Sequence, residues 1–360
     1  VIEEVTFEDA AMNRAIRELI GADEKELILS NQLWDITEFT VPGDASTYSD
    51  LAYLPNLTQL TIDSKELDNL DFLASLQKLQ ILNLPGCRFD TEDMAIAATL
   101  PALTELNLSN CGLSTVDFLE NAPSLKVLNV NNNTLRKLDV LTTIPTLESI
   151  NLQHNAVTGL EALGALANLK ELNIGYNSVT SLVPLAGCTQ LVRLNADHNT
   201  LENLEGLHAM AQLAYLSVDY NSIYAISVLT NNTALVDLSI ASNKITDISN
   251  LSALTKLEIL DFSGNQVEHL PQWADNCPLQ TVDGSYNQLS SIDSLSNLQS
   301  LTHVYMDYNL ITDINALENC FCLVQVNVYG NAIPDVSLLR DRDIIVNYDP
   351  TLAQAAEESE

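Results

Sequence analysis

The sequence predicts a β-rich α/β solenoid of horseshoe form, with short parallel strands on a concave face and 3₁₀ or irregular turns on the convex face. Three observations predict this fold. One phrase of 11 residues recurs along the chain with an asparagine every 22 residues. Apolar residues alternate inside the phrase, as they do in a strand that is buried on one face. After the asparagine they come at every third position, which suits tight turns better than long α-helices.

The repeated phrase is Leu-x-x-Leu-x-Leu-x-x-Asn-x-Leu, with substitutions among apolar residues. It runs from Leu147 to Val157 and again from Leu169 to Val179. Its asparagines are Asn133, Asn155, Asn177, Asn199, Asn221, Asn243, Asn265, Asn287, Asn309 and Asn331. Earlier copies carry Lys65, Cys87 and Cys111 at the asparagine position, and the copy around residues 91–98 is two residues longer. Each copy can bury its apolar residues only against its neighbours, so about thirteen copies should stack into one array.

The positions within one repeat predict its parts. In the copy that begins at Leu147, Ile150 and Leu152 should point into the core, and the residues between them should point outward. The asparagine can turn inward, where its amide would satisfy buried backbone groups as the chain leaves the strand. The apolar spacing of Ile245, Ile248 and Leu251 then predicts a short 3₁₀ turn.

The ends of a stacked array need covering. Residues Phe7 to Leu19 predict an amphipathic helix, with Asp9 as its N-cap and Gly21 as its C-cap. At the other end, Ile344 to Tyr348 predicts a short closing strand. We therefore expect a helical cap with a degenerate first repeat in residues 1–50, a repeat array in 51–348 and an acidic tail in 349–360.

The charge of the chain excludes several kinds of partner. It carries 48 acidic and 15 basic side chains, a net charge of −33. Nucleic acid and anionic membrane both need a basic surface, so neither is expected to bind. Between Leu194 and Leu339 the only basic residues are Lys244 and Lys256. A protein partner should therefore present a basic patch. No apolar stretch approaches the roughly 20 residues that cross a bilayer, so no transmembrane segment is expected.

The phrase from Asn243 to Leu251, Asn-Lys-Ile-Thr-Asp-Ile-Ser-Asn-Leu, resembles the 22-residue leucine-rich repeats of bacterial internalin-like proteins. The opening from Val5 to Gly21 is similar to the helical cap that precedes such arrays. The resemblance covers nearly the whole chain. It implies a rigid scaffold that binds a protein and is often displayed outside the cell. We therefore expect a non-catalytic monomer that binds its partner on the concave face and is secreted or displayed on the bacterial surface. The resemblance implies no cofactor.

Outward positions of the repeats carry seven of the eleven tyrosines. Exposed tyrosine suits a binding surface because it offers a large contact area with little side-chain entropy to lose. Two candidate partner-binding clusters result. The first comprises His154, Tyr176, His198, Tyr215 and Tyr220, and the second comprises Tyr286, His303, Tyr305, Asp307, Tyr308 and Tyr329. The alternative is that neighbouring tyrosines only stack on one another and shield the edge of the sheet.

Two pairs of aspartates also fall one repeat apart, Asp197 with Asp219 and Asp261 with Asp283. Such pairs can hold Ca²⁺ or share a proton, but solvated acidic surface is the simpler interpretation, because Ca²⁺ needs six or more oxygen ligands. No metal site is predicted, and no spacing assembles a nucleophile with its base, so no catalytic residue is predicted. A disulfide between Cys87 and Cys111 is conceivable from their consecutive repeats.

The sequence thus predicts a non-catalytic protein-recognition scaffold. The first alternative is an intracellular regulatory subunit that docks on a partner enzyme. A carbohydrate-binding protein and a hydrolase that uses the paired aspartates are further alternatives.

Overall fold

The computed structural model describes residues 2–340 and 342–351, and the chain forms two compact units. The N-terminal unit comprises the residues up to 157 together with 161–169, and the C-terminal unit comprises 158–160 together with the residues from 170 onward. Residues 352–360, most of the predicted acidic tail, lie outside the described residues.

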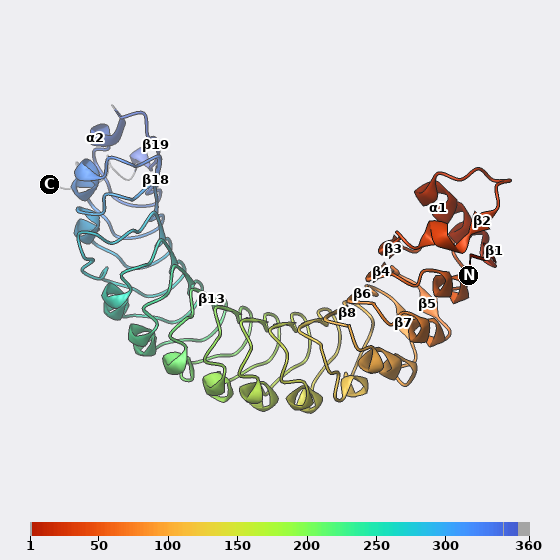
Figure 1. The fold of residues 1–360 in the computed structure, drawn as a ribbon. Coiled ribbons are helices and arrows are strands. Elements are labelled where there is room, and N and C mark those ends of the chain that lie inside the picture. Colours follow the sequence, from red (N-terminus) through yellow and green to blue (C-terminus); the bar gives the residue numbers. More distant parts are fainter. Residues whose placement is uncertain (1, 341, 352–360) are drawn as a thin grey trace. The chain divides into compact units, whose positions relative to one another are not determined.

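The N-terminal unit combines a cap with the first repeats of a parallel sheet. The cap contains helix α1 (Ala10–Ile20) and the antiparallel pair β1 (Glu4–Val5) and β2 (Ile28–Leu29). The parallel strands are β3 (Glu38–Thr40), β4 (Gln59–Thr61), β6 (Ile81–Asn83), β8 (Glu105–Asn107), β9 (Val127–Asn129) and β10 (Ser149–Asn151). A second, two-stranded sheet joins β5 (Glu66–Leu67) to β7 (Arg88–Phe89). Figure 1 shows α1, β1 and β2 gathered at the start of the chain, beside β3 and β4.

The C-terminal unit contains only repeats and a short final helix, α2 (Ser337–Arg340). Its parallel strands follow one another in sequence order (Figure 1). They are β11 (Glu171–Asn173), β12 (Arg193–Asn195), β13 (Tyr215–Ser217), β14 (Asp237–Ser239), β15 (Ile259–Asp261), β16 (Thr281–Asp283), β17 (His303–Tyr305), β18 (Gln325–Asn327) and β19 (Ile345–Asn347). The closing strand predicted from Ile344 to Tyr348 is β19, which pairs with β18.

Short 3₁₀ helices connect most of the parallel strands, as the spacing of three predicted, although the described residues between β15 and β16 form none. In the N-terminal unit they are η1 (Ser30–Leu33), η2 (Ser49–Tyr53), η3 (Asp71–Ser75), η4 (Asp93–Thr99), η5 (Asp117–Leu119), η6 (Asp139–Thr143) and η7 (Glu161–Ala165). In the C-terminal unit they are η8 (Val183–Gly187), η9 (Leu207–Ala209), η10 (Ser227–Asn231), η11 (Ser249–Ala253), η12 (Asp293–Leu295) and η13 (Asn315–Asn319). The two extra residues of the longer repeat fall in and beside η4, which spans seven residues.

A constant repeat length places equivalent residues side by side in the core. Leu216 of β13 pairs with Leu238 of β14, and both are buried. Ile150 and Leu152 are also buried, as predicted for the inward positions. Each leucine therefore packs against its counterparts one repeat away, and this burial supplies most of the stability of the stack.

The recurring asparagine turns inward and joins adjacent repeats by hydrogen bonds. The Asn243 amide donates to the carbonyls of Val218 at 3.0 Å, Ile240 at 3.1 Å and Ala241 at 3.0 Å. Its oxygen accepts from the backbone amide of Ile223 at 3.0 Å. The asparagine thus satisfies backbone groups that the irregular turn would otherwise leave buried and unpaired, as predicted.

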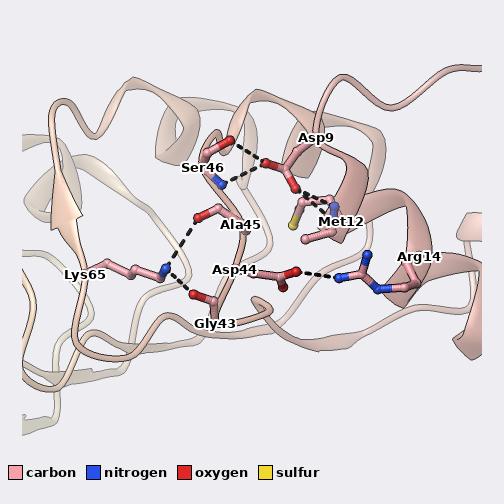
Figure 2. Close-up of polar contacts among 9 residues, drawn as sticks. Asp9, Met12, Arg14, Gly43, Asp44, Ala45, Ser46 and Lys65 are labelled. Carbon is pink, nitrogen blue, oxygen red and sulfur yellow. Dashed lines mark hydrogen bonds and ion pairs between the residues drawn. The ribbon is translucent and has the colours of Figure 1, made fainter.

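The earlier copies replace this asparagine with other donors. The Cys111 thiol donates to the carbonyl of Leu84 at 3.0 Å, and the Cys87 thiol donates to the carbonyl of Ile62 at 3.2 Å. The Lys65 ammonium group reaches the backbone carbonyls of the preceding repeat (Figure 2). Cys87 and Cys111 are both free thiols, so the disulfide considered for them does not form. Each sulfur instead donates to a backbone carbonyl of the preceding repeat.

Helix α1 closes the first repeat through its N-cap, as predicted for Asp9. One Asp9 oxygen accepts from the amides of Ala11 at 2.8 Å and Met12 at 2.9 Å, and the other accepts from the Ser46 amide at 2.7 Å (Figure 2). The helix ends at Gly21, whose φ of 67° is the left-handed conformation that glycine adopts without strain. Asp9 therefore caps the helix and ties it to the loop that precedes η2.

Candidate functional site

The outward side of the C-terminal sheet is a continuous polar surface. We call it the strand face. It consists of the first and third residue of each strand from β11 to β19, and of the two residues that precede each recurring asparagine. Because side chains alternate along a strand, most of these positions lie outside the core and repeat across the sheet at about 4.8 Å intervals, although Ala241 and Ser285 are buried. The sheet therefore displays the variable residues of the chain in rows on a rigid support.

Two aspartates join neighbouring repeats across this face. Asp197 accepts from the Ser217 hydroxyl at 2.6 Å and from the Asp219 amide at 2.8 Å. Asp219 repeats the pattern one strand later, with the Ser239 hydroxyl at 2.7 Å and the Ala241 amide at 2.7 Å. Their first role is thus structural, because each carboxylate holds the start of the next turn.

Some carboxyl groups of this face, among them Asp219, Asp283 and Asp307, have raised pKa values and are therefore harder to ionise than exposed ones. Burial, together with the nearby charges of Asp197 and Asp261, raises the pKa of Asp219 to about 6, although hydrogen bonds from Ser239 and Ala241 oppose the shift. Burial also raises the pKa of Asp283 and of Asp307. Negative charge is therefore concentrated here in poorly hydrated carboxylates, and a cation that approached them would relieve their mutual repulsion.

Three rings of the first predicted aromatic cluster stack on one another. The Tyr176 and His198 rings lie 4.0 Å apart between centroids, and the His198 and Tyr220 rings lie 4.3 Å apart. All three residues have φ between 51° and 55°, because the chain turns left-handed just before the asparagine. His154 adopts the same backbone conformation at φ 53° in the N-terminal unit.

The fifth residue of that cluster, Tyr215, has a different partner. Its ring lies beneath the Arg193 guanidinium, whose carbon is 3.5 Å from the ring centroid. The sequence prediction missed Arg193. The sequence did contain the information needed to place Arg193 beside Tyr215, because the two residues occupy the same position in consecutive repeats, one strand apart.

The second predicted cluster separates into two parts. Tyr286 and Tyr308 stack with centroids 4.7 Å apart, and Tyr329 meets Tyr308 edge-on at 5.6 Å. His303 and Tyr305 form their own pair on β17, at 6.2 Å. Asp307 accepts from the Tyr329 amide at 2.7 Å and so supports the edge-on ring. Tyr286, Tyr308 and Tyr329 remain 59%, 46% and 45% exposed, so stacking does not remove them from solvent.

The remaining reactive groups do not assemble into a second site. No group of three or more His, Cys, Asp or Glu in the described part of the chain could hold a metal ion. Of the cysteines, Cys188 and Cys320 are buried in the core, as predicted, and burial raises the pKa of Cys188 to about 11. Among the described residues, no helix is long and apolar enough to span a membrane.

Comparison with known proteins agrees with this architecture. Residues 101–143, 145–187 and 233–272 match the family described as "Leucine Rich repeats (2 copies)". An internalin from Listeria monocytogenes, InlF, is similar over 95% of both chains, with 23% identity and a TM-score of 0.74. A leucine-rich-repeat protein of Leptospira interrogans is similar over 84% of this chain and 80% of its own, with 24% identity and a TM-score of 0.75.

A plant receptor extends the comparison beyond bacteria. The peptide hormone receptor RGFR1, solved in complex with RGF2, shares 20% identity over 86% of this chain and 53% of its own, with a TM-score of 0.68. No curated protein sequence matches the chain. At these identities the likeness concerns the fold, which is the leucine-rich-repeat solenoid that the 22-residue period predicted.

Proposed function

We propose that this leucine-rich-repeat protein, internalin-like in its fold, is a non-catalytic scaffold that binds a protein partner on the strand face of its C-terminal unit. Leucine-rich-repeat proteins commonly serve as scaffolds for protein–protein interaction, and RGFR1 is one that was solved with RGF2 bound. We place the contact on the strand face because the exposed aromatic residues gather there.

The observation that carries the proposal is the row of exposed rings Tyr286, Tyr308 and Tyr329. Stacking holds these side chains in defined orientations, so little rotamer entropy remains to be lost when a partner covers them. Tyrosine also supplies both apolar area and a hydroxyl, a combination that is enriched at the energetic centres of interfaces. Shielding of the sheet edge alone would not require rings that remain about half exposed.

Charge indicates the kind of partner. The strand face carries Asp197, Asp219, Asp261, Asp283 and Asp307, whereas Lys244 and Lys256 are the only basic residues between Leu194 and Leu339. A partner with a basic patch would be attracted before contact and oriented by the field, and its binding would weaken as salt rises.

The proposal includes secretion or display on a bacterial surface. It is supported by the internalin-like cap and by the similarity to InlF over 95% of both chains. The carboxylates of the strand face support a non-catalytic role, because Asp197 and Asp219 are engaged in holding the following turn.

The test is capture of partners by the intact protein from extracellular and from cytosolic fractions, at low and at physiological salt. We expect a salt-sensitive extracellular protein with a basic surface. The joint variant Tyr305→Ala, Tyr308→Ala and Tyr329→Ala should weaken its binding at least about tenfold, the effect of losing one or more strong interface residues.

The matched control is Tyr224→Ala, which removes a tyrosine that is 58% exposed and outside the strand face. It should leave binding unchanged. Equal affinity for the triple variant, with unfolding midpoints unchanged, would remove the strand face from consideration. Capture of a specific cytosolic enzyme instead would support a regulatory subunit.

A further inference from the structure

The strand face already holds one arginine of its own chain. Arg193, Tyr215 and Asp237 are the first residues of β12, β13 and β14, and they pair consecutively across the sheet. The Arg193 guanidinium lies over the Tyr215 ring. Burial raises the pKa of Asp237, and the charge of Arg193 opposes part of that rise. Its Nε is also 3.9 Å from a carboxylate oxygen of Glu171. On this surface a guanidinium thus lies over a tyrosine ring, and a carboxylate follows on each side of that pair.

The same residue types recur farther along the face without a cation. Asp261, Asp283 and Tyr305 are the third residues of β15, β16 and β17, and they also pair consecutively. We call these three residues the acidic row. One oxygen of Asp261 accepts from the Ser263 amide at 2.9 Å, and one oxygen of Asp283 accepts from the Ser285 amide at 2.9 Å. These bonds fix the position of each carboxylate through one of its two oxygens.

The electrostatics of the acidic row favour binding of a positively charged group. Burial raises the pKa of Asp283, and the negative charges of Asp261 and Asp307 raise it further, against hydrogen bonds from Ser285. The sequence places no lysine or arginine on this part of the face, since Lys244 and Lys256 both lie outside the strand-face positions. Arg193 thus places a positive charge beside Tyr215, whereas the ring neighbour of Tyr305 is His303 and no lysine or arginine occupies this part of the face.

We propose that the acidic row is the docking point for an arginine side chain of the protein partner, an inference that rests on the strand face being the binding surface. The guanidinium would lie over the Tyr305 ring and bond to the carboxylates of Asp283 and Asp261. The exposed rings of Tyr286, Tyr308 and Tyr329 would contact apolar residues of the partner that neighbour this arginine. The charge of the row and the arrangement around Arg193 together define this occupant.

Arginine fits the row better than lysine for a geometric reason. Its planar guanidinium can stack on an aromatic ring and still donate in its plane to two acceptors. A lysine ammonium is a compact, strongly hydrated charge that must give up more water to enter the same place. The row should therefore distinguish these two cations, which a merely acidic surface would not do.

The experiment uses the whole protein labelled with 3-fluorotyrosine and followed by fluorine NMR, with the Tyr305 resonance assigned through Tyr305→Phe. The probe is the peptide acetyl-Gly-Ser-Arg-Ser-Gly-amide, compared with peptides in which lysine or citrulline replaces the arginine. We expect the arginine peptide to move the Tyr305 resonance to saturation. Its binding should be at least about fivefold tighter than that of the lysine peptide, and the citrulline peptide should leave the resonance in place.

Two variants locate the effect. Asp283→Asn should weaken binding of the arginine peptide about tenfold, since a charge-assisted hydrogen bond contributes that order of affinity. Glu268→Gln makes the same change of charge at an exposed position outside the strand face, and it should change the affinity less than twofold. Unchanged resonances of the other tyrosines show that each variant remains folded.

Several results would overturn the inference. These are equal affinities for the arginine and lysine peptides, an Asp283→Asn variant that binds as the parent does, or a Tyr305 shift produced equally well by CaCl₂. A captured partner that binds Asp283→Asn normally would end this inference and leave the proposed function standing. If the arginine peptide binds the row but Tyr308→Ala and Tyr329→Ala do not affect any captured partner, the proposed function fails instead.

Discussion

Replacing Asn243 with alanine tests how the repeats are joined. Asn243 is 7% exposed and lies in the middle of the C-terminal unit. The change removes its amide from the carbonyls of Val218, Ile240 and Ala241, and it removes its oxygen from the Ile223 amide. The leucine core is left intact. The variant therefore isolates the polar contribution of the recurring asparagine from hydrophobic burial.

The expected loss follows from the buried groups that lose their partners. A net intramolecular hydrogen bond contributes about 1 kcal/mol, and a buried amide left without an acceptor costs about 1–3 kcal/mol. The asparagine amide has only two hydrogens for its three carbonyl contacts, so the side chain makes the equivalent of about three bonds. Asn243→Ala should accordingly lower the free energy of unfolding by about 3–4 kcal/mol.

Two measurements would detect this loss of unfolding free energy. Urea unfolding should show a lower midpoint with a similar slope, because the surface exposed on unfolding barely changes. Hydrogen exchange should be faster at the Ile223 amide in particular, since its acceptor is Asn243 itself. Asn243→Cys should recover about half of the loss, because the Cys111 thiol already serves as a single donor at the same position in its repeat.

The matched control is Asn231→Ala at an exposed asparagine, whose amide is 3.4 Å from the Val228 carbonyl. It should cost less than about 0.5 kcal/mol. The reasoning fails if Asn243→Ala costs no more than this control and the Ile223 amide stays protected. In that case water would be replacing the asparagine, and leucine burial alone would hold the repeats together.

Three further predictions concern single side chains. Asp219→Asn should raise the free energy of unfolding at pH 7.5 by about 1–2 kcal/mol, because the folded-state pKa of about 6 exceeds the ordinary 3.8 and the side chain is partly exposed. The cost of the raised pKa builds up as the pH rises from about 4 to about 6, so calorimetry should show this gain disappearing as the pH falls through the same range. Asp9→Ala should destabilise the cap by about 2 kcal/mol and speed hydrogen exchange at the start of α1. Hydrogen bonds that outweigh burial hold the Asp9 pKa at about 2, so in the unchanged protein this contribution should be lost as the pH falls from about 4 to about 2. Cys322 is the one exposed cysteine of six and should alone react rapidly with a thiol reagent, and Cys322→Ser should abolish that fast phase. A second fast thiol would contradict the burial of the other five.

The sequence by itself predicted the buried apolar positions of the repeats, such as Ile150 and Leu152. A period of 22 residues fixes the register, because equivalent leucines can be buried only against one another. The sequence also identified Asp9 and Gly21 as helix caps, since both residues act through local backbone geometry. The outward positions of Tyr286 and Tyr308 followed from the same register, so the candidate binding residues could be named without a structure.

Only the tertiary structure decided which partner each outward side chain takes. Tyr215 lies under Arg193 instead of joining the His198 stack, and Tyr305 lies apart from the Tyr308 stack. Cys111 donates to a carbonyl instead of forming a disulfide. The physical reason is that periodicity specifies the face and the row of a residue. Rotamers, the left-handed turn before each asparagine and the charges across the sheet select among neighbours about 5 Å away, and a sequence pattern does not contain those choices.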